Sequence, residues 1–291
     1  MSGLAHFGER LQGAFDTRGR FCLGIDPHPW LLDAWGLDDT AAGVRELGLR
    51  AIDAATGRIG VVKPQVAFFE RHGSAGYQAL ERVLAEARDA GLLVIADVKR
   101  GDIGSTVDAY GDAWLGDASP LRADAMTIYA AQGLGSIERV MERADAAGRG
   151  LFVVAATSNP EAAVLQQAVL QRSSRAGSTV AGAIVGGVSA WNTERADAGS
   201  RALGAIGVVV GATVDPDEAG IDTATAVRPA PPVLVPGIGF QGGELAEVPA
   251  RLGALAAGAV FSDSRGVLQA GPEGLADAVA RRADEIGALD V

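Results

Sequence analysis

Short apolar runs alternate with longer, helix-like segments along almost the whole chain. Stretches such as 21–25 and 206–210 are apolar throughout, whereas 75–90 carries apolar residues at helical spacing. Strands that are apolar on both faces are typical of parallel sheets covered by helices, because neither face meets water. The pattern therefore predicts parallel strands connected by helices.

The order of these segments predicts the fold class. The predicted strands are 21–25, 59–62, 92–96, 123–129, 150–156, 206–210, 232–235 and 257–261. The predicted helices are 4–17, 41–55, 75–90, 110–115, 136–147, 161–172, 179–196 and 274–286. Strands that alternate with helices in this way indicate an α/β fold, a single (β/α)8 TIM barrel over residues 1–291, with an insertion around residues 30–40.

One segment fits two interpretations. Residues 179–196 are rich in small side chains, and 183–188 would also suit a strand. Gly186, Gly187 and Trp191 fit a closely packed helix at least as well, so we predict a helix there.

Composition narrows the class of protein. A chain of 291 residues that is 48% hydrophobic can bury a sizeable core, and its apolar runs are far shorter than the roughly 20 residues that span a membrane. The first residues lack the pattern of a signal peptide, and the single cysteine, Cys22, excludes an internal disulfide or a cysteine-cluster metal site. We therefore expect a cytoplasmic protein with no membrane partner. The net charge of -11 argues against nonspecific nucleic-acid binding.

Lysine is almost absent from the sequence. Of the 25 Lys and Arg residues, only Lys63 and Lys99 are lysine, and both follow apolar runs. An ammonium group can release its proton near neutral pH once its pKa is lowered, whereas a guanidinium in effect cannot. These positions suggest proton transfer, with ordinary ion pairs at strand ends as the alternative.

Charged residues accumulate where the run 92–96 ends. Asp97 and Lys99 are two residues apart, so in an extended chain their side chains point to the same face, while Asp102 lies beyond in the loop. Together with Lys63 they can hold one another charged in a place where a lone charge would be costly.

Polar residues also follow the other predicted strands. All strands of such a barrel end at one mouth, where active sites lie, so these side chains are expected to meet. They are Asp26, Ser158, Asn159, Gln241 and Arg265. The glycine-rich loop 237–243 and the turn 264–266 follow the last two strands, where backbone N–H groups and an arginine can bind a phosphate; ordinary loops are the alternative.

A metal ion between Asp97 and Asp102 is another possible interpretation of the charged cluster. Lys63 and Lys99 already supply about the positive charge of a divalent ion, so we expect no metal. The histidines lack the spacing of metal ligands, and His28, near the mouth, is expected to hold the loop after the first strand.

The stretch Asp97-Val-Lys99-Arg-Gly-Asp102 resembles the Asp-x-Lys-x-x-Asp signature of the orotidine 5'-phosphate decarboxylases, in the form of their longer bacterial branch. Further matches, in the family's order, are 24–29, 63–65, 68–70, 157–160, 236–239, 241–243 and 264–266. The hexulose-phosphate synthases and ketogulonate-phosphate decarboxylases share the bare signature but use magnesium and carry an acidic residue at the position of Lys63. Lys63 therefore favours the nucleotide decarboxylase.

The resemblance implies cofactor-free decarboxylation of orotidine 5'-phosphate to uridine 5'-phosphate in pyrimidine biosynthesis. It implies that Lys99 protonates C6 of the pyrimidine as carbon dioxide leaves, with Asp97 beside the substrate carboxylate. Lys63 and Asp26 are implied to hold the ribose hydroxyls.

The resemblance also implies the remaining contacts and a dimer. By this resemblance, Ser158 and Asn159 contact the pyrimidine edge. Gln241 and Arg265 contact the 5'-phosphate. Asp102 and Thr106 are implied to reach the neighbouring subunit's site, which makes a homodimer part of the mechanism.

Two rival functions stay open. One is a magnesium-dependent aldolase or decarboxylase acting on a sugar phosphate. The other is a phosphate-sensing binding protein that has lost catalysis, although binding alone would not need Lys99.

Overall fold

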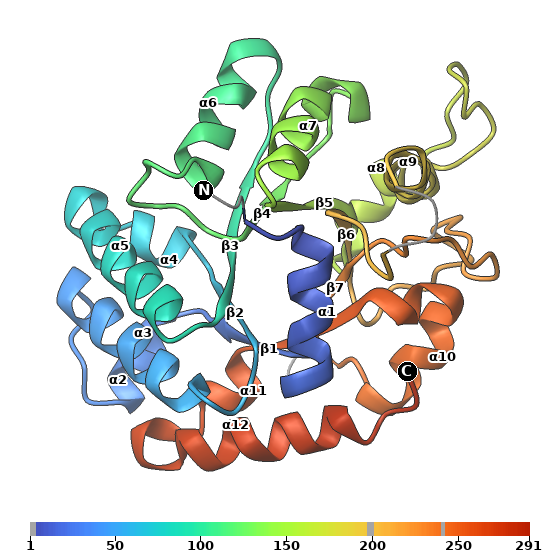
Figure 1. Ribbon diagram of the computed structural model, residues 1–291. Helices are drawn as coiled ribbons and strands as arrows, with labels where there is room; N and C mark the ends of the chain where they lie inside the picture. Colours follow the sequence, from blue (N-terminus) through green and yellow to red (C-terminus); the bar gives the residue numbers. More distant parts are fainter. Residues whose placement is uncertain (1–3, 197–200, 240–241) are drawn as a thin grey trace.

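The computed structural model describes residues 4–196, 201–239 and 242–291. In this part of the chain eight parallel strands close into a barrel in sequence order, and the last strand pairs with the first (Figure 1). The strands are β1 (Phe21–Ile25), β2 (Val61–Pro64), β3 (Leu93–Arg100), β4 (Ala125–Ile128), β5 (Gly150–Ala156), β6 (Ile206–Val210), β7 (Val233–Pro236) and β8 (Ala259–Asp263). The predicted TIM barrel is confirmed.

Helices surround the barrel (Figure 1). The α-helices are α1 (Phe7–Arg18), α2 (Pro29–Ala34), α3 (Ala41–Ala55), α4 (Ala67–Glu70), α5 (Gly73–Asp89), α6 (Gly104–Leu115), α7 (Glu138–Ala146), α8 (Ala163–Gln166), α9 (Val180–Glu194), α10 (Val248–Leu252), α11 (Arg265–Leu268) and α12 (Gly271–Gly287). The 3-10 helices are η1 (Leu134–Ile137), η2 (Pro160–Ala162), η3 (Leu245–Glu247) and η4 (Gly253–Gly258). Within the described ranges, none of the helices is both long and apolar enough to cross a membrane.

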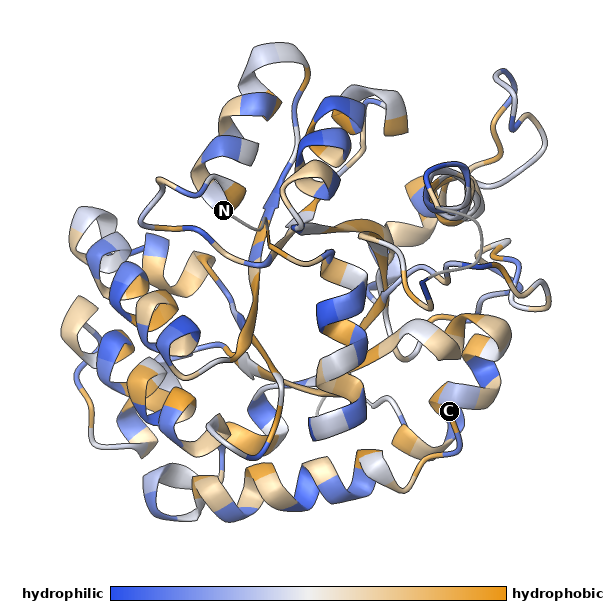
Figure 2. Ribbon diagram, in the orientation of Figure 1, coloured by the Kyte–Doolittle hydropathy of each residue, from blue (hydrophilic) through white to orange (hydrophobic). Residues whose placement is uncertain are grey.

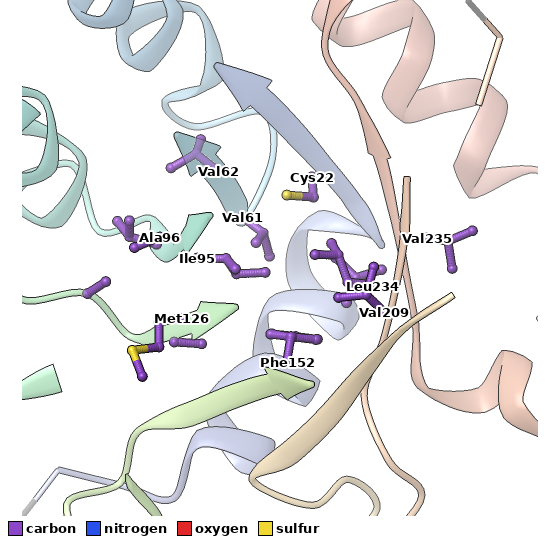
Figure 3. Close-up of a cluster of buried hydrophobic side chains, with 14 of the residues drawn as sticks. Cys22, Val61, Val62, Ile95, Ala96, Met126, Phe152, Val209, Leu234 and Val235 are labelled. Atoms are coloured by element: carbon purple, nitrogen blue, oxygen red, sulfur yellow. The ribbon is translucent and has the colours of Figure 1, made fainter. Parts of the chain in front are cut away.

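The barrel interior is the centre of the core. Strands β1, β5, β6 and β8 are buried at every position, as expected for strands covered on both faces. Hydrophobic colouring follows the strands, whereas the outer faces of the helices are hydrophilic (Figure 2). Cys22, Val61, Ile95, Phe152 and Leu234 come from different strands and converge inside the barrel (Figure 3). Their packing fixes the strands from which the polar residues project.

Helix α1 covers the end of the barrel where the strands begin. It lies across the barrel in Figure 1, and Phe7 meets Phe152 edge to face at 6.1 Å between ring centroids. The neighbouring strands approach it so closely that a Cβ on Gly150 would lie 2.4 Å from the Phe7 ring. This end is therefore filled by side chains.

The helix predicted at 161–172 is too long. The 3-10 helix η2 ends at Ala162 and α8 ends at Gln166, and Val169 then bridges to Thr179 in antiparallel fashion. Val164 and Leu165 are exposed, so this segment has no apolar face against the barrel to support a longer helix. The alternative at 179–196 is settled in favour of a helix, α9.

Strands β2 and β3 run beyond the apolar runs 59–62 and 92–96. Lys63, Asp97 and Lys99, which were predicted to end these strands, are confirmed as strand residues. Pairing persists because Arg100 of β3 pairs with Ile128 of β4 after a register shift. The charged side chains are thus carried by hydrogen-bonded backbone.

Three residues of the predicted insertion at 30–40 are buried, whereas most of the others are exposed. Leu31 and Leu32 of α2 are buried, and Trp35 Nε1 donates to Leu268 O at 3.0 Å. The segment therefore connects the loop after β1 to α11.

A network of buried charges stabilises the end where the strands begin. Asp124 Oδ2 accepts from Val94 N at 2.9 Å, while its Oδ1 lies 2.5 Å from Arg10 Nη1 and 3.1 Å from Arg149 Nη1. Arg149 is itself buried, and Asp124 is its buried partner, while its Nη2 lies 3.0 Å from the exposed Asp117 Oδ1. One carboxylate thereby joins α1, β3 and the start of β5.

Asp124→Ala should lower the free energy of unfolding by about 3 kcal/mol, because it leaves Arg149 without its buried carboxylate partner and only exposed Asp117 remains. Arg82→Ala is the matched control, since it breaks an exposed pair with Glu86 and should cost less than about 0.5 kcal/mol. Urea unfolding measures both. Equal losses in the two variants would contradict the proposed network.

Candidate active site

A cavity of about 290 Å³ lies at the end of the barrel where the strands finish. Every strand, or the loop directly after it, contributes to its lining. The predicted site residues that line it are Asp26, Lys63, Asp97, Lys99, Ser158, Asn159 and Arg265. Residues far apart in the sequence thus meet at one mouth, as predicted from the strand ends.

Three predicted site residues do not belong to this set. Asp102 and Thr106, both described, lie outside the cavity in the exposed segment after β3, where Asp102 Oδ1 accepts from Ile103 N at 2.8 Å. Gln241 lies outside the described residues. The cavity of one chain therefore contains only part of the predicted site.

Asp97 is the centre of the charged cluster. Its side chain is 6% exposed, and its Oδ2 lies 2.9 Å from Lys63 Nζ. Its Oδ1 accepts from Lys99 Nζ and, at 2.8 Å, from Thr127 Oγ1. When the side-chain amide of Gln65 is oriented with its nitrogen toward Asp97, this nitrogen donates to Asp97 Oδ2 at 3.1 Å. These donors leave the carboxylate no freedom to turn away from the cavity.

The cluster changes the acidity of each member in a different direction. Burial would raise the pKa of Asp97, but attraction by Lys63 and Lys99 outweighs it and holds this pKa well below the usual value. Burial would lower the pKa of Lys63, but Asp97 and then Asp26 raise it above the usual value. For Lys99 burial prevails over the attraction of Asp97, and the pKa is lowered. The two ammonium groups are therefore chemically distinct.

Lys99 has an unusual backbone. Its φ of 46° lies in the left-handed region, which costs a residue with a side chain about 1–3 kcal/mol. Its N–H donates to Thr127 Oγ1 at 2.9 Å. Regular strand alternation predicted that Asp97 and Lys99 lie on one face. The Lys99 ammonium does reach Asp97, but it does so from a left-handed backbone conformation. Thr127 fixes both the backbone of Lys99 and the carboxylate that it contacts.

Asp26 offers a carboxylate to the cavity. It follows β1, and its Oδ1 lies 4.0 Å from Lys63 Nζ. This oxygen accepts no hydrogen bond from the described residues. It is therefore positioned to accept one from a ligand hydroxyl.

A side chain at the end of α8, Gln166, holds the turn after β5 in place. Gln166 Oε1 accepts from Thr157 N at 2.8 Å, and Thr157 Oγ1 donates to Asn159 Oδ1 at 2.8 Å. Asn159 Nδ2 donates in turn to Glu161 Oε2 at 3.0 Å. Ser158 and Asn159 are thereby placed at the rim of the cavity.

The loops after β7 and β8 form the opposite end of the cavity. Gly237 and Gly239 have φ values of 94° and 69°, which favour glycine, and Gly239 N donates to Gly243 O at 2.9 Å. Gly237 and Arg265 both line the cavity. A guanidinium thus lies at the same end as a tight glycine turn, which suits an anion.

Several residues that line the cavity were not among the predicted site residues, and three of them adjoin its charged groups. Thr127 and Gln65 contact Asp97, and Asp263 ends β8 beside the turn of Arg265. Thr127 and Asp263 each interrupt an apolar run at a strand end, a signal that could have been noticed. Gln65 stood in the segment 63–65 that matches the decarboxylase family, but no role was assigned to it.

His28 has the predicted structural role. Its ring lies 4.2 Å from that of Phe68 and stacks with Trp30 at 6.2 Å. Burial lowers its pKa, although Asp26 opposes the change. The histidine therefore packs the loop after β1 against α4.

Asp97→Asn should destabilise the fold in a pH-dependent manner. Because folding lowers the pKa of Asp97, its charge stabilises the fold fully above the unfolded carboxyl pKa of about 4 and less as the pH falls below it. The difference in unfolding free energy between wild type and variant should therefore shrink below about pH 4. Urea unfolding across a pH series measures it. A difference that stays constant from about pH 2 to 7 would contradict the ion pairs.

The chain is similar to known proteins over nearly its whole length. Residues 19–278 match the family described as orotidine 5'-phosphate decarboxylase / HUMPS. An orotidine 5'-phosphate decarboxylase from Nocardioides sp. is 45% identical over 281 residues, 96% of this chain and 98% of that protein.

Solved structures agree with the sequence comparison. A chain from Streptomyces avermitilis is 44% identical, with a TM-score of 0.89 over 99% of this chain and 96% of that chain. The orotidine 5'-phosphate (OMP) decarboxylase of Leishmania donovani is 27% identical, with a TM-score of 0.71 over 97% and 98% of the two chains. The chain therefore belongs to the orotidine 5'-phosphate decarboxylase / HUMPS family.

Proposed function

We propose that the chain decarboxylates orotidine 5'-phosphate to uridine 5'-phosphate in pyrimidine biosynthesis, in the cytoplasm. The observation that carries this proposal is a fixed carboxylate, Asp97, between the ammonium groups of Lys63 and Lys99 in the cavity. The relatives named as orotidine 5'-phosphate decarboxylases match the chain almost from end to end. Both the chemistry of the site and the family therefore support a carboxy-lyase.

Lys99 is the proton donor in this mechanism. When the bond from C6 to the carboxylate breaks, carbon dioxide leaves and an electron pair remains at C6 in the ring plane, where the π system cannot delocalise it. An ammonium aimed at that carbon stabilises the developing charge. Its N–H bond then breaks and the new C6–H bond forms. The lowered pKa of Lys99 makes the ammonium a stronger acid for this step.

Asp97 acts on the substrate carboxylate by repulsion. Lys63, Lys99 and Thr127 hold it in place, so it cannot move away when a second carboxylate arrives. The repulsion is relieved as the substrate carboxylate becomes neutral carbon dioxide. Binding energy from distant parts of the substrate offsets the cost of bringing the two charges together.

The remaining residues bind the ends of the substrate. Asp26 accepts hydrogen bonds from the ribose hydroxyls, and Lys63 donates to them. This assignment is supported by Asp26 Oδ1, which accepts no hydrogen bond from the described residues. The other proposed contacts are to the pyrimidine edge, by Ser158 and Asn159, and to the 5'-phosphate, by Arg265 and Gln241. The glycine turn beside Arg265 supports a phosphate at that end.

The reaction is proposed to need no cofactor. Lys63 and Lys99 provide two positive charges on either side of Asp97, at the position where a divalent cation would otherwise bind that carboxylate. The same pair distinguishes the proposal from a magnesium-dependent sugar-phosphate enzyme, whose metal these ammonium groups would repel.

Turnover of orotidine 5'-phosphate with and without a chelator tests the proposal. The purified chain is mixed with the nucleotide, and its absorbance is followed. Turnover that the chelator does not affect is the expected result. Loss of turnover with the chelator would indicate a metal-dependent relative, and binding without turnover would indicate a phosphate sensor; either would overturn the proposal.

Lys99→Ala should lower kcat by about 10³–10⁴-fold, because both charge stabilisation and proton donation are lost. Lys99→Arg should not restore it, since a guanidinium does not release a proton at neutral pH. Steady-state rates measure the effect, and circular dichroism confirms that each variant is folded. Near-normal activity of Lys99→Arg would show that Lys99 is not the proton donor.

We propose further that the enzyme is a homodimer with shared sites. Asp102 and Thr106 follow the strand that carries Asp97 and Lys99 yet lie outside the cavity of their own chain. Exposed Ile103, between them, offers apolar area for a contact between subunits. These positions support a role for both residues in the partner's site.

Mixing two inactive variants tests the shared site. If Asp102 completes the partner's site, a hybrid of Lys99→Ala and Asp102→Asn subunits contains one intact site. Refolding an equal mixture should therefore recover about a quarter of wild-type activity. No recovery, in a mixture that gel filtration shows to be dimeric, would contradict sharing.

A further inference from the structure

The phosphate end of the cavity contains a buried acid that the proposed mechanism does not use. Asp263, the last residue of β8, is 4% exposed and lines the cavity next to Arg265. An isolated buried carboxylate is costly, and one close to a phosphate would repel it. Its presence at this end therefore requires a compensating contact.

Arg282 supplies that contact. Its Nη2 lies 2.9 Å from Asp263 Oδ2, and it comes from α12, on the outside of the barrel. Arg282 opposes the rise that burial causes in the pKa of Asp263. Arg282 also forms an ion pair with Glu285, whose Oε2 lies 3.2 Å from Arg282 Nη1 and whose side chain is exposed. A surface helix thus neutralises a charge at the edge of the cavity.

The pair holds the loop after β8 and lies close to the loop after β7. Asp263 Oδ1 accepts from Gly266 N at 3.1 Å and so fixes the turn that carries Arg265. A Cβ on Gly239 would lie 3.6 Å from Arg282 Nη2 and 3.9 Å from Asp263 Oδ2, so the loop after β7 passes close to the same two side chains. Two loops from different strands therefore lie beside one ion pair.

We propose that Asp263 and Arg282 are positioning residues that hold these two loops in register and thereby set the affinity for the 5'-phosphate. This inference rests on the proposed function, because it assigns the phosphate of the nucleotide to this end. Arg282 has a second effect: by compensating Asp263 it reduces the repulsion between that carboxylate and a phosphate bound at this end. Removing Arg282 alone is consequently worse than removing both charges.

Phosphate-dependent and phosphate-independent reactions separate positioning from general damage. The variants are Arg282→Met, Asp263→Asn and the double variant; kcat/KM is measured for orotidine 5'-phosphate and for orotidine, which lacks the phosphate. Arg282→Met should reduce kcat/KM for the nucleotide by about tenfold or more, the effect of one charged hydrogen bond. The double variant should recover part of this loss, because no uncompensated carboxylate remains.

Asp263→Asn alone should lose less than Arg282→Met, since its amide oxygen still accepts from Gly266 N. In each variant, kcat/KM for orotidine should stay nearly unchanged. The ratio of kcat/KM for the nucleotide to kcat/KM for the nucleoside should therefore fall by the same factor as kcat/KM for the nucleotide. Glu285→Gln is the matched control, because it removes the other partner of Arg282 and should change kcat/KM less than about twofold. If Arg282→Met does not fold, Arg282→Lys replaces it and should retain most of the affinity.

The inference is overturned if nucleotide and nucleoside reactions lose equally, if neither changes, or if the double variant is no better than Arg282→Met. Titration with inorganic phosphate separates this outcome from failure of the proposed function. Phosphate binding that depends on Arg282 in a chain that does not decarboxylate the nucleotide would reject the function alone. Normal decarboxylation with phosphate binding unaffected by Arg282 would reject the inference alone.

Discussion

The chemistry of the site depends on a buried carboxylate shared by two ammonium groups. Asp97 remains charged inside the barrel because Lys63 and Lys99 compensate it, and each lysine remains there because Asp97 compensates it in turn. Removing Asp97 would leave two ammonium groups without this carboxylate, and removing either lysine would leave Asp97 with one ammonium partner instead of two. The cluster is therefore both a structural requirement and a source of reactive groups.

The barrel separates this costly arrangement from the part that supplies stability. At the end where the strands begin, α1 and the network around Asp124 fill and neutralise the interior. At the other end Lys99 adopts a left-handed backbone and carries an ammonium that burial makes more acidic. Strain is maintained there because β3 and β4 remain paired beyond it.

The sequence was sufficient to predict the barrel and seven of the residues that line the cavity, because apolar runs that end in polar or charged residues identify both strands and their ends. It could not predict contacts that depend on side chains meeting across the fold. Thr127 reaches Asp97 from a neighbouring strand, and Arg282 reaches Asp263 from a surface helix. The helix expected at 161–172 is shorter than predicted because the composition of the segment suits a helix but no packing surface supports a longer one.

The most direct measurement follows the two lysine ammonium groups themselves. Lys63 and Lys99 are the two lysines of the sequence. NMR of protein labelled with 15N at lysine Nζ should therefore give two signals, which single substitutions can assign. As the pH is raised, Lys99 should lose its proton first, below the ordinary pKa of lysine, and Lys63 later, above it. Two lysines that titrate together at the ordinary value, or Lys63 before Lys99, would contradict the account.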